Sequence, residues 1–223
     1  MSYIINIDTA TETAFVNIAK DGVIINGLEN TAQKDHGAFV QTAIASLLTA
    51  AGIQFNEVGA IAVTAGPGSY TGLRVGMASA KGLSYALDKP LITISTLELW
   101  AAAAIRQSSE ASTFFFCSMI DARRIEVFTA VYNHLLSPVM APAALVLNDL
   151  SYRELLENQI IVFTGNGAAK WQNICTHPNA RFMPLAEIPA AMAIMTNQAL
   201  TNKQFTDLAY AEPFYLKEFQ NNI

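Results

Sequence analysis

The chain has 223 residues, of which 52% are hydrophobic and only 14% are charged, so it can bury a core of one large or two small domains and is not expected to be disordered. Its formal net charge of −5 and the lack of any cluster of Lys and Arg argue against a basic face for direct nucleic-acid binding. The high apolar content indicates either that another chain covers part of the surface or that alanine is simply abundant.

The first hundred residues are predicted to alternate strands and helices. Three antiparallel strands open the chain, and the second hairpin is expected at Asp21-Gly22, a pair typical of a tight turn. An amphipathic helix is predicted from Asp35 to Ala51, with Gly52 as its stop. Further elements are expected as a strand from residue 60, a helix at 72–87, a strand at 91–94 and a helix at 96–106. This order is typical of a mixed sheet flanked by helices.

The second half is predicted to begin with a β-hairpin. Two strong β runs, 113–120 and 125–132, are joined by the polar segment Asp121-Ala122-Arg123-Arg124. Later elements are expected as an edge strand at 138–147, a helix at 151–157, a strand at 160–164 and helices at 168–173 and 186–201. A boundary between residues 107 and 113 therefore predicts two domains, residues 1–108 and residues 109–223. Each half opens with antiparallel strands before its helices.

Compartment and redox state follow from simple features. Cys117 and Cys175 are isolated and lack metal-ligand spacing, which predicts reduced thiols in a cytoplasmic protein. The N-terminus runs straight into a strand, without a basic segment or a long apolar core. Neither a signal peptide nor a membrane span is therefore predicted.

A glycine-rich stretch between residues 60 and 87 reads as strand, turn and helix. The turn at Gly66-Pro67-Gly68 could cradle an anion, because backbone N–H groups and the helix dipole point the same way. Its spacing matches neither a dinucleotide fingerprint nor a Walker loop. In the helix, Gly72, Gly76 and Ala80 recur every four residues, so something is expected to pack closely against that flank.

Several short segments of the chain, taken in combination, match one known protein family. They are Ile7-Asp8-Thr9, His36, the turn and helix start at 65–76, Ala80-Lys81-Gly82-Leu83, Pro90-Leu91, Ser95-Thr96-Leu97-Glu98 and Asp121-Ala122-Arg123. They resemble the TsaB family, also called YeaZ, over most of residues 1–130. The rest matches loosely, mainly at residues 164–168 and 213–217. The resemblance implies an α/β fold of the ASKHA type (actin, hexokinase, heat-shock ATPase), with two subdomains of mixed sheets flanked by helices.

The resemblance also implies a function. Members of this family support threonylcarbamoyl transfer to the adenosine beside the anticodon of tRNA, acting through a TsaD-like catalytic paralogue and a TsaE-like ATPase. The chain is accordingly expected to be a cytoplasmic, non-catalytic subunit without a cofactor of its own, and to meet tRNA only indirectly through the complex. A homodimer in isolation is a further expectation.

Metal chemistry is disfavoured by the residues present. The catalytic paralogue binds its metal through two histidines of a segment that corresponds here to residues 95–100. Thr96 and Trp100 stand where those imidazoles would be needed, and neither side chain is a good ligand. A metallopeptidase or a metal-dependent transferase is therefore not expected.

The remaining polar candidates have simpler interpretations. Asp8 could hold magnesium beneath nucleotide phosphates, and the alternative function is therefore a nucleotide-dependent kinase or hydrolase. The favoured interpretation is that the Asp8 carboxylate caps its turn by accepting from the backbone N–H of Thr9 or Thr11. No triad partner supports Ser69 or Thr71 as a nucleophile, so these residues are expected to start the helix.

The helices at 35–51 and 72–87 are the stronger functional candidates. Both carry apolar or small residues over wide arcs, so a second face could meet helices of another chain. The predicted partner interface consists of His36, Val40, Ala43, Ile44, Leu47, Gly72, Leu73, Gly76, Met77 and Ala80. A large charged residue at Gly76 is expected to abolish pairing while the isolated chain stays folded.

Overall fold

The computed structural model describes residues 2–31 and 36–217, which form two compact units. The first unit contains the chain up to Thr96 together with Pro189–Phe214, and the second contains Leu97–Ile188 and the described residues from Tyr215 onward. The sequence predicts two contiguous domains divided near residue 108. The observed units are not contiguous, because the last long helix returns to the first unit.

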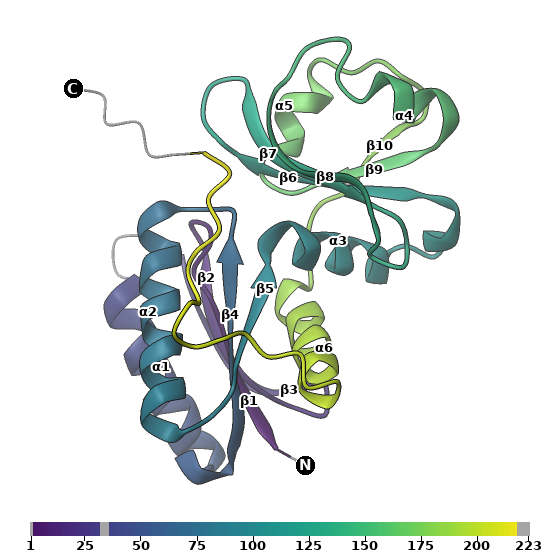
Figure 1. Cartoon of the computed structure of the whole chain (residues 1–223). Helices are drawn as coiled ribbons and strands as arrows, with labels where there is room; N and C mark the ends of the chain where they lie inside the picture. The colour runs from purple at the N-terminus through teal and green to yellow at the C-terminus, as the bar shows by residue number, and fades with distance from the viewer. Residues whose placement is uncertain (1, 32–35, 218–223) are drawn as a thin grey trace, which may run out of the picture. The chain divides into compact units, whose positions relative to one another are not determined.

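The first unit is built on a five-stranded sheet of order β3-β2-β1-β4-β5 (Figure 1). Strand β1 pairs antiparallel with β2 and parallel with β4, so the sheet is mixed. The predicted meander is confirmed, and its second turn has Asp21 and Gly22 at φ of 52° and 78°. The strands are β1 Tyr3–Asp8, β2 Ala14–Lys20, β3 Val23–Asn30, β4 Val58–Gly66 and β5 Leu91–Ser95.

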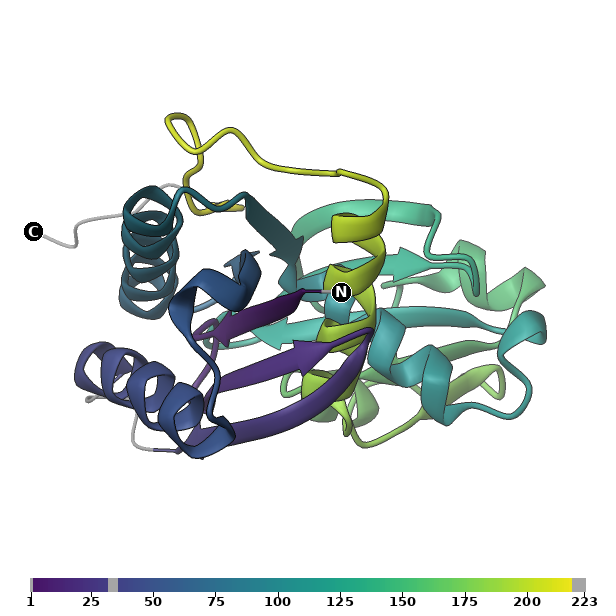
Figure 2. The ribbon, with the colours of Figure 1, turned by 90° about the horizontal axis from the view of Figure 1, so that it is seen from below.

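Three helices cover this sheet. Helices α1 (His36–Ala51) and α2 (Tyr70–Leu87) lie against one face, and α6 (Ile188–Thr201) lies against the other (Figure 2). Gly52, at φ of 66°, follows the end of α1 as predicted, whereas the predicted start at Asp35 lies outside the described residues. Buried aliphatic side chains of α1 pack with those of β1 and β2 in one core. The amphipathic pattern of α1 therefore reports its inner face correctly.

The second unit repeats the topology of the first. Its sheet has the order β10-β9-β6-β7-β8, so in both sheets the first strand pairs antiparallel with the second and parallel with the fourth. The strands are β6 Phe115–Asp121, β7 Glu126–Tyr132, β8 Pro138–Val146, β9 Ile161–Thr164 and β10 Ala180–Phe182. The helices are α3 Thr96–Gln107, α4 Arg153–Asn158 and α5 Ala168–Gln172. The sequence predicts all of these except β10, whose three residues are too few to show alternation.

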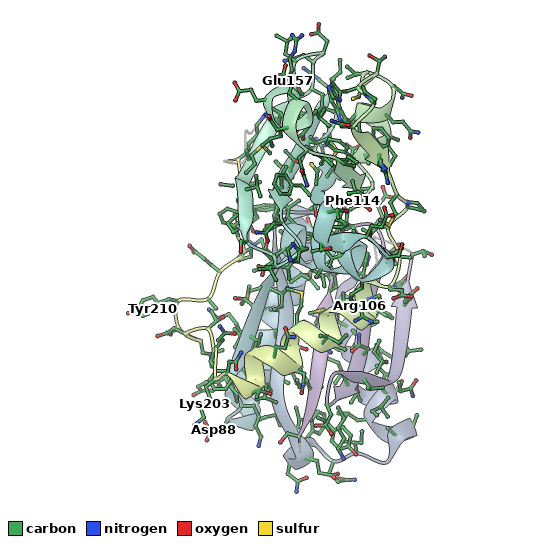
Figure 3. The ribbon with its side chains drawn as sticks, turned by 90° about the vertical axis from the view of Figure 1, so that its right-hand side faces the viewer. Asp88, Arg106, Phe114, Glu157, Lys203 and Tyr210 are labelled. Carbon is green, nitrogen blue, oxygen red and sulfur yellow. The ribbon has the colours of Figure 1, made fainter. Side chains whose placement is uncertain are left out.

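Beyond α6 the chain forms a strap, residues 202–214, along the open edge of the first sheet. The backbone N–H of Thr206 donates to the Leu91 carbonyl oxygen at 2.8 Å, and Phe214 N–H donates to the carbonyl of Ala65 at 2.6 Å. Figure 3 shows Tyr210, which is 84% exposed, pointing away from the strap into solvent. The strap thus covers the β5 edge, which would otherwise stay unpaired.

Cys117 and Cys175 are free thiols, and burial raises the pKa of the Cys117 thiol to about 12. No helix in the part of the chain that the structure describes has the length and apolar character needed to span a membrane.

Candidate functional site

The glycine-rich turn between β4 and α2 is filled by the end of β1. The backbone N–H of Ser69 donates to the Ala10 carbonyl oxygen at 2.6 Å, and the Thr9 hydroxyl donates to the Gly72 carbonyl at 2.7 Å. Ser69 caps α2 as predicted, since its hydroxyl accepts from the Gly72 N–H at 3.3 Å. A bound anion would have to displace the Ala10 carbonyl from Ser69, so the turn serves to join β1 to α2.

Three glycines permit this close approach. A Cβ added to Gly68 would lie 2.3 Å from the Ala10 carbonyl oxygen, and one added to Gly72 would lie 2.1 Å from that of Thr9. A Cβ on Gly76 would lie 2.3 Å from the Thr9 hydroxyl oxygen. The close packing predicted from the glycine spacing is therefore present, but its occupant is the chain itself. A large charged residue at Gly76 would disturb the subunit's own fold, contrary to the expectation that the isolated chain stays folded.

Asp8 caps the loop that enters this turn. Its Oδ1 accepts hydrogen bonds from the Ala10 backbone N–H at 2.9 Å and from the Thr64 hydroxyl at 2.8 Å. The capping interpretation is thus supported, with Ala10 as the donor in place of Thr9 or Thr11. Asp8 is only 3% exposed, and this burial raises its pKa although both hydrogen bonds and nearby His36 oppose the rise.

The raised pKa of Asp8 predicts a specific pH dependence of stability. The folded state holds the Asp8 proton more tightly than the unfolded state does, so protonation of Asp8 stabilises the fold. This stabilisation is fully present below the ordinary pKa of an aspartate and is lost as the pH rises through the raised pKa of Asp8 in the folded state. Asp8→Asn removes this titration. In urea denaturation from about pH 3.5 to about pH 7, the wild-type free energy of unfolding should fall relative to that of the variant. Parallel profiles would contradict this assignment.

His36 is a buried structural side chain at the start of α1. It is 3% exposed, and its Nε2 lies 3.2 Å from the Glu12 carbonyl oxygen, which requires Nε2 to carry the proton. The ring thereby ties the loop between β1 and β2 to α1.

All ten residues of the predicted interface point inward within the first unit. Each of the eight with a side chain beyond hydrogen is at most 3% exposed, and Gly72 and Gly76 are buried as well. The exposed face of the same helix pair consists of other residues: Gly37, Ala38, Gln41, Thr42, Ala45, Ser46, Thr49 and Ala50 on α1, and Tyr70, Thr71, Arg74, Ala78, Gly82, Tyr85 and Ala86 on α2. We call this set the α1–α2 face.

The α1–α2 face is nearly uncharged and its side chains are mostly small. Arg74 is the one charged residue among its members, and its guanidinium donates to the Tyr70 hydroxyl at 2.6 Å. The two helices are linked at the surface, where the Gln41 amide donates to the Ser79 hydroxyl at 3.1 Å. Small residues without charge allow another helix to approach closely.

Thr96 and Trp100, the positions where the family resemblance implies histidines in a catalytic relative, hold buried side chains. Thr96 is fully buried and Trp100 is 3% exposed. The indole of Trp100 packs under Gly165, whose Cβ, if present, would lie 2.6 Å from the ring. Within the described residues, no group of three or more His, Cys, Asp and Glu side chains is placed to hold a metal ion.

Lys81 has a role that the sequence does not reveal. Its Nζ donates to the carbonyl oxygens of Ala211 at 2.8 Å and Ala209 at 3.3 Å, which fastens the strap to α2. An open groove of about 690 Å³ beside this contact is lined by Lys81, Gly82, Tyr85, Asp207, Leu208 and Ala209. Lys81 precedes its two partners by 128 and 130 positions in the chain, so no local sequence pattern predicts this contact.

The tip of the β6–β7 hairpin is held in an unusual backbone conformation. Arg123 and Arg124 have φ of 71° and 44°, a region where each non-glycine residue costs about 1–2 kcal/mol. Asp121 forms an ion pair with Lys170 at 2.8 Å. Partial burial alone would raise the pKa of Asp121. The hydrogen bonds from Lys170 and from the Arg123 backbone N–H, together with the Lys170 charge, outweigh it and lower that pKa.

Comparison with known proteins gives consistent results. The family model described as TsaD, tRNA N6-adenosine threonylcarbamoyltransferase, matches residues 28–214. A tRNA threonylcarbamoyladenosine biosynthesis protein TsaB of Bacillus subtilis is 32% identical over 168 residues, which cover 73% of this chain and 70% of that protein. The TsaB protein of Escherichia coli is 34% identical over 58% of this chain, and the match spans about half of that relative, 54%.

Solved structures share the fold. YeaZ from Pseudomonas aeruginosa superposes with a TM-score of 0.75 at 24% identity, covering 97% of this chain and all of that one. The ethanolamine utilization protein EutJ from Carboxydothermus hydrogenoformans has a TM-score of 0.55 at 12% identity, covering 87% of this chain and 90% of that one. The two mixed five-stranded sheets flanked by helices are of the ASKHA type, as the family resemblance implies.

Proposed function

Since this chain belongs to the TsaB (YeaZ) family, we propose that it is a non-catalytic subunit required for threonylcarbamoyl transfer to the adenosine beside the anticodon of tRNA. The transfer itself is assigned to a TsaD-like catalytic partner, assisted by a TsaE-like ATPase. The names of the relatives support the pathway, and the family model supports a partner of the TsaD type.

The α1–α2 face is the observation that carries the proposal. It offers two neighbouring helices whose exposed residues include one charge, on a chain whose net charge is −5. Charged residues are depleted at the centres of protein interfaces, and small side chains let helices pack closely. We assign this face, in place of the ten buried residues, as the docking surface for two helices of the catalytic partner.

A non-catalytic role is supported by the polar residues of the first unit. Asp8 is buried and already accepts two hydrogen bonds, and the glycine-rich turn is occupied by Thr9 and Ala10. A nucleotide-dependent kinase or hydrolase would need both features open to phosphate and magnesium. Calorimetric titration with ATP and magnesium checks this alternative, which requires binding that Asp8→Ala abolishes.

Reconstitution tests the proposed function directly. A mixture of the TsaD-like partner, the ATPase, tRNA and the threonylcarbamoyl donor is assayed with and without this chain. Formation of modified adenosine should depend on the chain, and the chain alone should form none. Equal turnover in its absence would refute the proposal.

In isolation the α1–α2 face is expected to pair two copies of this chain. Light scattering should then show that the TsaD-like partner competes with this self-association.

A further inference from the structure

We propose that the tip of the β6–β7 hairpin, Arg123 and Arg124, contacts the phosphate backbone of the tRNA while the RNA is held by the complex. This inference rests on the proposed function and adds a direct RNA contact to a chain that is otherwise expected to meet tRNA only through its partner. Three features of the second unit carry it: the fixed backbone of the tip, the unpaired charge of its two arginines and its exposed position.

The tip is held by its surroundings and is not a loose loop. Asp121 Oδ1 accepts from the Arg123 backbone N–H at 2.7 Å, and the Asn166 side chain accepts from the Asp121 N–H at 2.9 Å. The Glu126 N–H closes the turn by donating to the Arg123 carbonyl at 3.0 Å. Residues that favour left-handed backbone, such as glycine or asparagine, would form this turn with less strain. Arginine thus occupies both positions against local preference, and backbone strain of this kind is concentrated at functional sites.

The neighbouring carboxylates are already neutralised by lysines from elsewhere in the unit. Lys170 pairs with Asp121 at 2.8 Å, and Lys217 pairs with the Glu126 carboxylate at 2.5 Å. Neither Arg123 nor Arg124 forms an ion pair with another side chain in the described ranges, and both are exposed. Two positive charges thus remain at the end of the hairpin.

The chemistry of the tip favours phosphates over a protein surface. A protein interface needs an apolar centre, whereas the tip presents two guanidinium groups and one half-exposed aliphatic side chain, Ile125. Phosphodiester oxygens require only charged or hydrogen-bonding donors, and guanidinium binds them with two hydrogen bonds. Because the whole chain is acidic, two such contacts can assist RNA binding but cannot support it alone.

The test uses the assembled complex of this chain with its TsaD-like partner and labelled tRNA. The double variant R123N/R124N removes both charges, and asparagine tolerates the left-handed backbone, so folding should be preserved. The control R106Q/R153Q removes two exposed arginines of the same unit and changes the net charge equally. Fluorescence anisotropy gives the Kd for tRNA at several salt concentrations, and pull-down gives the affinity for the partner.

We expect R123N/R124N to raise the Kd for tRNA about 5- to 10-fold near 100 mM salt and to reduce the slope of log Kd against log salt by about 1.4 to 1.8. The control should change neither quantity comparably. Unchanged tRNA binding, or an equal loss in the control, overturns the hairpin contact while leaving the proposed function intact. Loss of partner affinity alone would make the tip a protein contact and also overturns it. A wild-type mixture that fails to modify tRNA refutes the proposed function itself.

Discussion

Gly72→Ala is expected to lower the free energy of unfolding by about 2 kcal/mol, although alanine is the better helix former. The added Cβ would lie 2.1 Å from the Thr9 carbonyl oxygen, a backbone atom that follows directly on strand β1. Either α2 or the end of β1 must move to relieve this overlap. Overpacking of a well-filled site costs about 3 kcal/mol at its upper range, and the gain in helix propensity offsets at most about 1 kcal/mol of that.

Gly82→Ala is the matched control for this prediction. Gly82 lies in the same helix, and a Cβ there would meet no atom within 4 Å. The substitution should therefore stabilise the chain by up to about 1 kcal/mol. Urea denaturation of wild type and both variants measures the difference. If Gly72→Ala is as stable as Gly82→Ala, the close approach of Thr9 to α2 does not have the energetic role assigned here.

Ala78→Glu is expected to weaken binding of the TsaD-like partner at least about 100-fold, while thermal stability of the isolated chain stays unchanged. Ala78 belongs to the α1–α2 face and is exposed on α2, so a longer, charged side chain fits the free subunit without strain. In the complex it would be buried without a counter-charge, and an unpaired buried charge typically costs about 3–5 kcal/mol. Calorimetry or surface-bound titration with the purified partner gives the affinity.

The control for the docking surface is Ala169→Glu. Ala169 is also an exposed alanine on a helix, but it belongs to α5 of the second unit. The same chemical change there should leave the partner's affinity within about two-fold of wild type. Equal affinity of Ala78→Glu and wild type would place the docking surface elsewhere. A common loss in both variants would indicate a general effect of negative charge and would equally contradict the assignment.

The secondary structure could be predicted well because its signals are local. The turn at Asp21-Gly22, the stop at Gly52 and the cap at Ser69 each follow from the conformational preferences of one or two residues. The antiparallel strands that open each unit also follow from the order of the elements. Strand β10 was missed because three residues cannot display a period.

The orientation of the candidate surface could not be predicted in this way. Helix α1 has alanine, serine and threonine on its outer side and valine, isoleucine and leucine on its inner side. The predicted interface is taken from the most apolar residues of the helix, and these are the residues that pack against the sheet. The glycines of α2 likewise predict that something packs closely against the helix, but they do not indicate which residue it is. That neighbour is Thr9, more than sixty residues earlier in the chain, and only the fold brings the two together.

The way the strap and α6 complete the first unit has a consequence during synthesis. Synthesis of strand β5 is complete once Ser95 has been added to the nascent chain. Thr206, which pairs with the free edge of β5, is added 111 residues later. At typical translation rates this delay lasts about 6 to 22 s, during which an unpaired strand edge and the face destined for α6 remain open. The second unit, lying between these two segments, can fold first. The nascent chain is therefore most prone to aggregate in this interval, which makes it the natural point of action for a chaperone.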